Sequence, residues 1–425
     1  MFKKTLIKSL LCSILIGSMA AISTPAMATS EAMLNLLKIL RDKGSITADE
    51  YAALEHAAKA DGEQVDKIAS EAKANVKEVT EKLSWAEKIK IKGDVRLRYQ
   101  QDFDHNTTDP KDRGRGRVRA RAGIIATPTD SVEAGIGMAS GGSDLRSTNQ
   151  SFEGTFDTKG WNLDYAFAKW EPAQVDGLSV IGGKYYWKDW FWQTTDIAID
   201  KDITFEGGSL NYKFKNSLGE TFANAGFWIA DENSTADDPR IYYAQGGHKF
   251  KFGDAHLKVG GTYFSLDGNR AELLTSAGGA FGSDNNTTTQ FGEIYGASFE
   301  LGTKTKFLGA EKVAIFGDFW TNESTGVTSN DTAIAIGAKI GSKKVKKKGT
   351  WEAKYIGGDI AKNAFLDMFP DSDRAGGATG VASHEFEVKY AFMDNWTVGV
   401  DYYNTNNYTD NKDEDLVQAD LVFSF

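Results

Sequence analysis

The feature that most constrains this fold is an alternation of polar and apolar residues, which runs with a period of two from Ile89 to the end of the chain. Its most extreme form is the stretch RGRGRVRARAG, in which arginine occupies every second position: Arg113, Arg115, Arg117, Arg119 and Arg121. Residues i, i+2 and i+4 of a β-strand point to one side, so the five guanidinium groups would share one face and apolar side chains the other. This pattern predicts a strand with water on one side and a nonpolar medium on the other.

The same alternation predicts sixteen strands between residues 88 and 425. The predicted strands begin near residues 89, 113, 131, 160, 177, 204, 221, 240, 255, 289, 311, 331, 350, 384, 395 and 414. The links between them alternate in length, from short turns such as FGD and MDN to much longer polar links such as residues 361–383. This asymmetry is typical of outer-membrane barrels, whereas a soluble β-sandwich gives no reason for it.

The predicted sheet must close on itself if it lies in a membrane. An unpaired backbone N–H or C=O group costs several kcal/mol in hydrocarbon, so an open sheet edge does not persist there. The predicted fold class is therefore all-β: a closed antiparallel transmembrane β-barrel of sixteen strands, wide enough to leave an aqueous channel. An even number of strands places both ends of the barrel on the short-turn side, so we expect the preceding segment in the periplasm.

Residues 1–28 have the layout of a secretory signal peptide. A lysine-rich start is followed by an apolar run from Leu10 to Ile22, and then by the small-residue cleavage site AMA. Cys12 is the sole cysteine and lies inside the apolar run, so a lipoprotein anchor fits poorly and the mature chain has no disulfide. Without the three lysines of the signal, the net charge falls from −10 to −13, which argues against nucleic-acid binding.

Residues 29–87 have helical periodicity and are predicted to form a periplasmic segment. A first amphipathic helix ends near Gly44, and Thr47 with Glu50 forms a capping box that starts a second helix. A third helical piece extends from about residue 64 to residue 85. Its heptad seam consists of Val65, Ala69, Ala72, Val76, Val79 and Leu83. Two interpretations are open: a helix that packs on the barrel, or a short coiled coil between subunits, which we favour.

Charged residues at inward positions of the predicted strands are the candidate pore-lining residues. They are Arg96, Arg98, Arg113, Arg115, Arg117, Arg119, Arg121, Glu133, Asp318, Glu385 and Glu387. A row of cations faced by acids sets a field that acts on hydrated solutes. In the alternative interpretation the arginines only pair with the acids and hold the wall rigid, and the two roles are compatible.

The link from Lys188 to Asp202 is the third long link and the candidate constriction. We expect it to fold into the barrel, with its tryptophans against the wall and its charged residues in the opening. The predicted constriction residues are Trp190, Trp192, Asp196, Asp200, Lys201 and Asp202. The alternative is an external loop whose aromatic residues lie at the membrane interface.

The sequence contains no pattern that indicates catalysis or metal binding. The five histidines stand in no metal-binding spacing, and no nucleophile elbow or phosphate-binding loop is present. Ser383 and His384 are adjacent, so on a strand they would point to opposite faces. We therefore expect a protein that is not an enzyme and that has no cofactor and no metal site.

Parts of the chain resemble known families. The segment GGKYYWKDWFWQTTDIAIDKDITFEGGSLNYKF, residues 182–214, is similar to the glycine-lysine strand, tryptophan-rich loop and returning EG strand of the bacterial putative-porin family. The entry IKGDVRLRYQ resembles the same family, and KGSITADEYAAL resembles the start of the phosphate-selective porins. The final strand ends on Phe425, which resembles the signal that the barrel-assembly machinery recognises.

These resemblances imply a homotrimeric porin embedded in outer-membrane lipid. Its function would be the passive diffusion of small hydrophilic solutes and ions through a water-filled channel. The alternative is a structural or adhesive protein that links the envelope to external or cell-wall partners.

Overall fold

The chain divides into a helical unit that ends at Lys88 and a β-unit from Ile89 to Phe425. The computed structural model describes residues 25–105, 111–142, 144–232, 234, 237–267, 286–408 and 412–425. Most of the predicted signal peptide, residues 1–24, lies outside the described residues.

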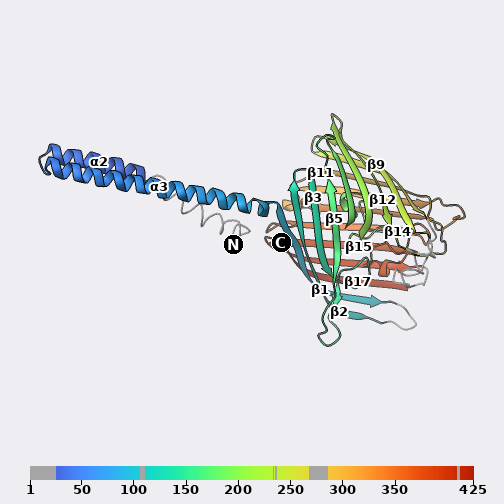
Figure 1. The fold of residues 1–425 in the computed structure, drawn as a ribbon. Coiled ribbons are helices and arrows are strands. Elements are labelled where there is room, and N and C mark those ends of the chain that lie inside the picture. The colour runs from blue at the N-terminus through green and yellow to red at the C-terminus, as the bar shows by residue number, and fades with distance from the viewer. Residues whose placement is uncertain are drawn as a thin grey trace. The chain divides into compact units, whose positions relative to one another are not determined.

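The helical unit is a hairpin of α2 (Pro25–Asp42) and α3 (Ala48–Glu87) (Figure 1). The predicted capping box is confirmed, because the Glu50 amide donates to the Thr47 hydroxyl and the Thr47 amide donates to the Glu50 carboxylate. The prediction of separate second and third helices is wrong, since α3 is one helix of 40 residues. A glycine inside a helix costs only about 1 kcal/mol, so Gly62 does not interrupt it.

The predicted heptad seam lies on α3, where Val65 is exposed and Ala69, Ala72 and Val76 are half-buried. The side chains of its last two members, Val79 and Leu83, lie outside the described residues. Within the part of the chain that the structure describes, no helix has the length and apolarity needed to cross a membrane.

The β-unit is a closed antiparallel barrel of sixteen strands, as predicted (Figure 1). The barrel strands are β1 (Ile89–Asp104), β2 (Arg113–Thr129), β3 (Val132–Ser140), β5 (Trp161–Trp170), β6 (Leu178–Tyr186), β7 (Thr204–Asn216), β8 (Gly219–Ile229), β9 (Arg240–Phe252), β10 (Ala255–Asp267), β11 (Ile294–Lys304), β12 (Lys312–Asn322), β13 (Thr332–Gly341), β14 (Trp351–Ile360), β15 (Val381–Met393), β16 (Trp396–Asn407) and β17 (Lys412–Ser424). The short β4 (Gln150–Ser151) lies in the link between β3 and β5 and pairs with β2. The links also contain the short 3-10 helices η1 (Trp187–Asp189), η2 (Phe307–Gly309) and η3 (Ala375–Gly377).

Closure comes from the pairing of the first and last strands. Residues of β1 and β17 are in register from Asp94 opposite Ser424 to Asp104 opposite Glu414. Both ends of the barrel therefore lie at the same rim. The largest difference from the predicted strand starts is at β11, which begins at Ile294 rather than near residue 289.

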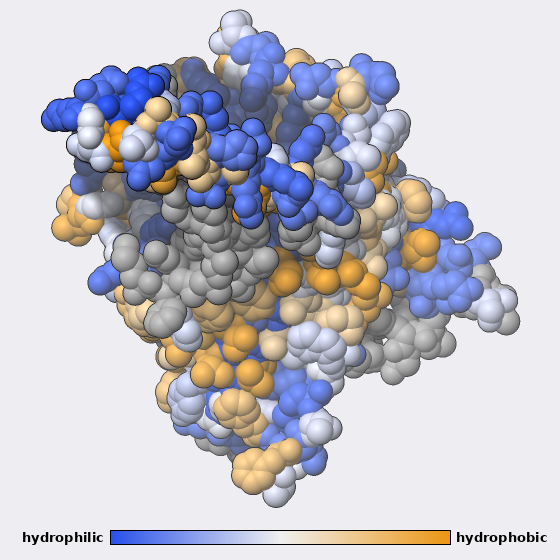
Figure 2. All heavy atoms as spheres, turned by 60° about the vertical axis from the view of Figure 1, so that its left-hand side comes forward, coloured by the Kyte–Doolittle hydropathy of each residue, from blue (hydrophilic) through white to orange (hydrophobic). Residues whose placement is uncertain are grey.

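The two faces of the wall differ in polarity as the alternation predicts. On β13 the outward Ile334 and Ile336 are each 57% exposed, while the intervening Ala335 is buried. On β15 the inward Glu385 and Glu387 are buried and the outward Phe386 is exposed. Figure 2 shows hydrophobic side chains gathered on the outer wall of the β-unit. This wall suits a nonpolar medium outside and polar contents inside.

Candidate functional site: the pore interior

The link between β6 and β7, here the 187–203 loop, lies inside the barrel. The ring of Phe191 stacks on the ring of Trp320, an inward residue of β12, with 6.0 Å between their centroids. The hydroxyl of Tyr243 on β9 donates a hydrogen bond to the carbonyl of Trp190 at 2.9 Å. All four aromatic side chains are buried. An aromatic core therefore fixes the loop to the inner wall.

Two polar side chains of the wall also hold this loop by its backbone. The Asp318 carboxylate accepts from the amides of Thr194 and Thr195 at 3.0 and 2.6 Å, and from the Thr195 hydroxyl at 2.7 Å. The Gln245 side chain accepts from the Trp192 amide at 2.8 Å and donates to its carbonyl at 2.7 Å. Asp318, predicted to line the pore, thus has an anchoring role.

A second loop, between β14 and β15, also lies against the 187–203 loop and is here the 361–380 loop. Its hydrophobic stretch AFLDMF is buried throughout. Backbone hydrogen bonds join the two loops, from the Asp200 amide to the Phe369 carbonyl at 2.6 Å and from the Asp371 amide to the Asp196 carbonyl at 3.2 Å. The residue alternation predicted only a long link here and did not predict its position inside the barrel.

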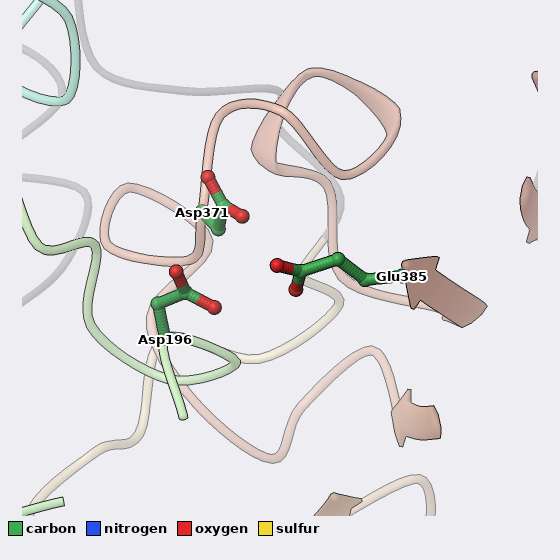
Figure 3. A group of neighbouring side chains, drawn as sticks. All are labelled: Asp196, Asp371 and Glu385. Carbon is green, nitrogen blue, oxygen red and sulfur yellow. The ribbon is translucent and has the colours of Figure 1, made fainter. Parts of the chain in front are cut away.

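Three carboxylates meet where the two loops reach β15 (Figure 3). Oxygens of Asp196, Asp371 and Glu385 all lie within 4.8 Å of one another. The Arg374 guanidinium donates to Asp196 at 3.5 Å and to Glu385, and its Nε lies 3.8 Å from Asp371. The group is buried. Because Asp196 and Arg374 come from the two loops and Glu385 from β15, these contacts join both loops to the wall.

This cluster carries its own counter-charges. Lys201 lies 3.3 Å from Asp196, and Lys354 lies 2.6 Å from Glu385. Together with Arg374, these side chains balance the three carboxylates. Among the described residues, this group of three acids could offer oxygens to a divalent cation, but the positive charge of Arg374 already balances them. We therefore interpret the cluster as an ion-pair network.

The loop carboxylates titrate differently because their neighbours differ. Burial, with a further contribution from Asp202, raises the pKa of Asp200 to about 7. Burial and then the charge of Asp196 raise the pKa of Asp371 well above its ordinary value. Burial opposes ionisation of Asp196 as well, but Lys201 and Arg374 overcome it and lower the pKa of Asp196.

The inward arginines of β1 and β2 are here called the arginine wall. They are Arg96, Arg98, Arg113, Arg115, Arg117, Arg119 and Arg121. Arg119 and Arg121, in its middle part, are paired with acids. The Asp94 carboxylate accepts from Arg119 Nε at 3.0 Å and from Arg121 Nε at 2.7 Å. Both guanidinium groups also reach Asp202 of the 187–203 loop, at 3.7 and 3.4 Å. Two cations thus share two carboxylates, one on the wall and one on the loop.

Arg98, on the neighbouring strand, is paired in the same way. Its Nε and NH2 atoms donate to the two oxygens of Asp420 at 2.7 and 2.8 Å, a bidentate contact. Its NH1 atom donates to Asp373 of the 361–380 loop at 3.3 Å. Arg96 donates to Asn149 at 2.6 Å and lies 3.7 Å from Asp420.

Toward the start of β2 the arginine wall has fewer acids. Arg117 donates to Gln100 at 3.0 Å and to the Ser147 hydroxyl at 3.5 Å, both uncharged. Arg115 reaches one carboxylate, that of Asp102, at 3.8 Å. Arg113 is exposed at the end of the strand.

The other predicted residues are more scattered. Glu133 is on β3 beside Lys169, at 3.4 Å, apart from the two inward loops. Glu387 lies 3.2 Å from Lys354 and also contacts Lys389. The Lys201 side chain is 42% exposed, so it faces open space inside the barrel.

Sequence reasoning missed several residues that organise the interior, because each depends on how a loop folds. The missed residues are Asn149, Gln245, Lys354, Asp373 and Arg374. The one signal available was the AFLDMF stretch, which is unusually hydrophobic for an external link.

One solved structure shares this fold, and others are less similar. A solved structure of Pseudomonas putida OprB, 10% identical, matches with a TM-score of 0.53 over 82% of this chain and 96% of that chain. A triple mutant of Rhodopseudomonas blastica porin, 13% identical, aligns over 79% of this chain and 100% of that chain with a TM-score of 0.44. No curated protein sequence matches the chain.

A family model also matches part of the sequence. Residues 104–292, from the end of β1 to the link before β11, match a family model described as "Putative porin". The matched region includes most of the arginine wall and the whole 187–203 loop. The predicted resemblance to the putative-porin family is therefore confirmed over residues 104–292.

Proposed function

We propose that the protein is an outer-membrane porin, a channel for the passive diffusion of small hydrophilic solutes and ions. One observation carries the proposal: a closed sixteen-stranded barrel whose outer wall is apolar and whose inner wall is charged. Barrels of this size are wide enough for an aqueous channel. The family match over residues 104–292 supports the same function, and a channel rather than an enzyme is the function that these observations favour.

The permeation path that we propose runs along the arginine wall and past the two inward loops. The candidate constriction residues of the 187–203 loop support this, since Asp202 contacts the arginine wall and Asp196 contacts Arg374. The partly exposed Lys201 adds a cation beside them. Charges of both signs then surround a passing ion, which favours hydrated polar solutes.

Conductance tests the proposal directly. The purified protein, with the barrel fold checked by heat-modifiable migration on a gel, is added to planar lipid bilayers under voltage. Stepwise ionic conductance is expected. A folded protein that gives no conductance would contradict the channel and would favour the structural or adhesive alternative.

We further propose a homotrimer with its helical unit in the periplasm. The even strand number supports this orientation, because both barrel ends lie at one rim. The exposed apolar residues of the hairpin, Met33, Leu36, Ile39, Leu54, Val65 and Ile68, support self-association. The barrel-assembly machinery is the proposed partner of Phe425, whose amide and carbonyl pair with Gly93 at 3.0 and 3.3 Å.

A further inference from the structure

We infer that Arg115 and Arg117 of β2, with Gln100 of β1 beside them, form a binding subsite for a small oxyanion such as inorganic phosphate or a carboxylate. The inference rests on the proposed channel and deepens it. It assigns different roles to different parts of the arginine wall, which the sequence alone presents as one uniform row.

Arg98, Arg119 and Arg121, in the middle of the arginine wall, form ion pairs that stabilise the barrel and the inward loop. Arg119 and Arg121 share Asp94 and Asp202, and Asp202 belongs to the 187–203 loop. Arg98 pairs with Asp420 of β17 and so bridges the first and last strands. These guanidinium groups already have carboxylate partners, so a passing anion would have to compete with those carboxylates.

Arg117 has no such partner. Its two hydrogen bonds go to neutral oxygens of Gln100 and Ser147. Among the described residues no carboxylate oxygen lies within the 4.0 Å limit of an ion pair with it. Its Nε atom is buried and donates to no acceptor in the described part of the chain. A half-buried guanidinium without a counter-ion is costly, and an anion would relieve that cost.

Arg115 adds a second, weakly balanced cation beside it. Its single carboxylate, Asp102, lies 3.8 Å away and is already engaged, because Gln100 donates to it at 2.9 Å. The Nε atom of Arg115 is likewise buried without an acceptor among the described residues. Two arginines against one acid leave the subsite with net positive charge.

The geometry suits an oxyanion better than a halide. Residues two apart on a strand are roughly 7 Å apart along the chain and project to the same side. Two guanidinium forks can therefore close on one group with several oxygens, as they do with phosphate and carboxylate. The Arg115 side chain is 24% exposed, so a solute in the lumen can reach it.

The position of the subsite gives it a place in permeation. β2 begins at Arg113, directly after the link from residue 105 to residue 112, so this end of the arginine wall lies on the long-link side. The 187–203 loop contacts the wall further along, at Arg119 and Arg121. An anion entering from the long-link side would meet Arg115 and Arg117 before the candidate constriction.

Chloride current with added phosphate or succinate tests the subsite in planar bilayers. We expect inorganic phosphate to reduce the current saturably in the wild type, and Arg115→Gln with Arg117→Gln to raise the half-blocking concentration at least tenfold. Arg240→Gln removes an exposed cation at the start of β9, on the outward parity of that strand, and should leave the block unchanged. Succinate in place of phosphate shows whether carboxylates bind equally well. A wild-type current that phosphate does not affect, or equal block in both variants, would overturn the subsite.

Two further measurements separate this inference from the channel itself. Arg117→Lys keeps the charge but removes the fork, so it should keep the reversal potential of the wild type and still weaken the phosphate block. It also tests the subsite if the double variant does not fold. Titration calorimetry of the detergent-solubilised protein with phosphate measures binding independently of any current. Binding without conductance would contradict the channel alone, and conductance without binding would contradict the subsite alone.

Discussion

At the scale of single residues, the Asp318 carboxylate holds two consecutive amides of the 187–203 loop. Asp318→Asn keeps the size but replaces one acceptor oxygen with a donor that faces other donors. We expect a loss of about 1–3 kcal/mol at this buried contact and a noisier open-channel current. Thermal unfolding and current variance measure the two effects. Asp189→Asn, an exposed acid near the start of the loop, is the matched control, and equal behaviour of the two variants would refute the anchor.

Asp200 gives a pH-dependent contact between the two inward loops. Its side chain accepts from the Ser372 amide at 3.0 Å, and its pKa is raised to about 7. A carboxyl whose folded pKa lies above its unfolded value contributes stability at low pH, and that contribution is lost as the pH rises through 7. We expect the melting temperature of the wild type to fall relative to that of Asp200→Asn between pH 5 and pH 8. A difference that stays constant over this range would exclude the titration of Asp200.

The arginine stretch shows what residue spacing can and cannot predict. Period two correctly places the guanidinium groups of Arg117, Arg119 and Arg121 on one face, because strand geometry is local. Their partners were not predictable, since Asp202 comes from a loop whose path depends on packing far along the chain. Which arginines of the wall have carboxylate partners therefore depends on how the loops fold, and residue spacing does not predict it.

At the scale of elements, Arg374 links both inward loops to β15. Arg374→Met would leave Asp196 and Glu385 buried with one counter-charge fewer. Loss of one partner of a buried ion pair costs on the order of 3–5 kcal/mol, so we expect the heat-modifiable form to unfold at lower temperature and the conductance to rise. Arg374→Lys should recover part of both. Wild-type conductance and stability in Arg374→Met would show that the network does not hold the loops.

The strands were more predictable than the loops for a physical reason. A membrane strand carries its own signal, because one face must be apolar and the other polar along its whole length. The 361–380 loop carries no such period, and its burial follows from contacts with the 187–203 loop. In the helical unit, the heptad pattern predicted a separate third helix, whereas α3 continues through Gly62, whose cost of about 1 kcal/mol the continuous backbone hydrogen bonds outweigh.

At the scale of the whole molecule, closure is a property of the β-unit alone. Pairing of β1 with β17 completes the barrel using only residues from Asp94 onward. Removal of residues 30–86, with the predicted signal peptide retained, should therefore leave a heat-modifiable barrel with unitary conductance. If the helical hairpin joins subunits, the same deletion should lower the mass in detergent from trimer to monomer, which light scattering measures.

A second variant tests whether the apolar surface of the hairpin, rather than the mere presence of residues 30–86, holds the subunits together. Leu36→Lys with Ile39→Lys places charge on the exposed face of α2 and leaves Leu37, which is buried in the hairpin, unchanged. Burial of two large apolar side chains contributes roughly 3–6 kcal/mol in each subunit, enough to shift a trimer of moderate affinity toward monomers. We expect this variant to dissociate as the deletion does while its helix content, measured by circular dichroism, is retained. Trimers that persist in both variants would place the subunit contacts on the barrel wall, where the apolar outer residues of β13 and β15 offer a second surface.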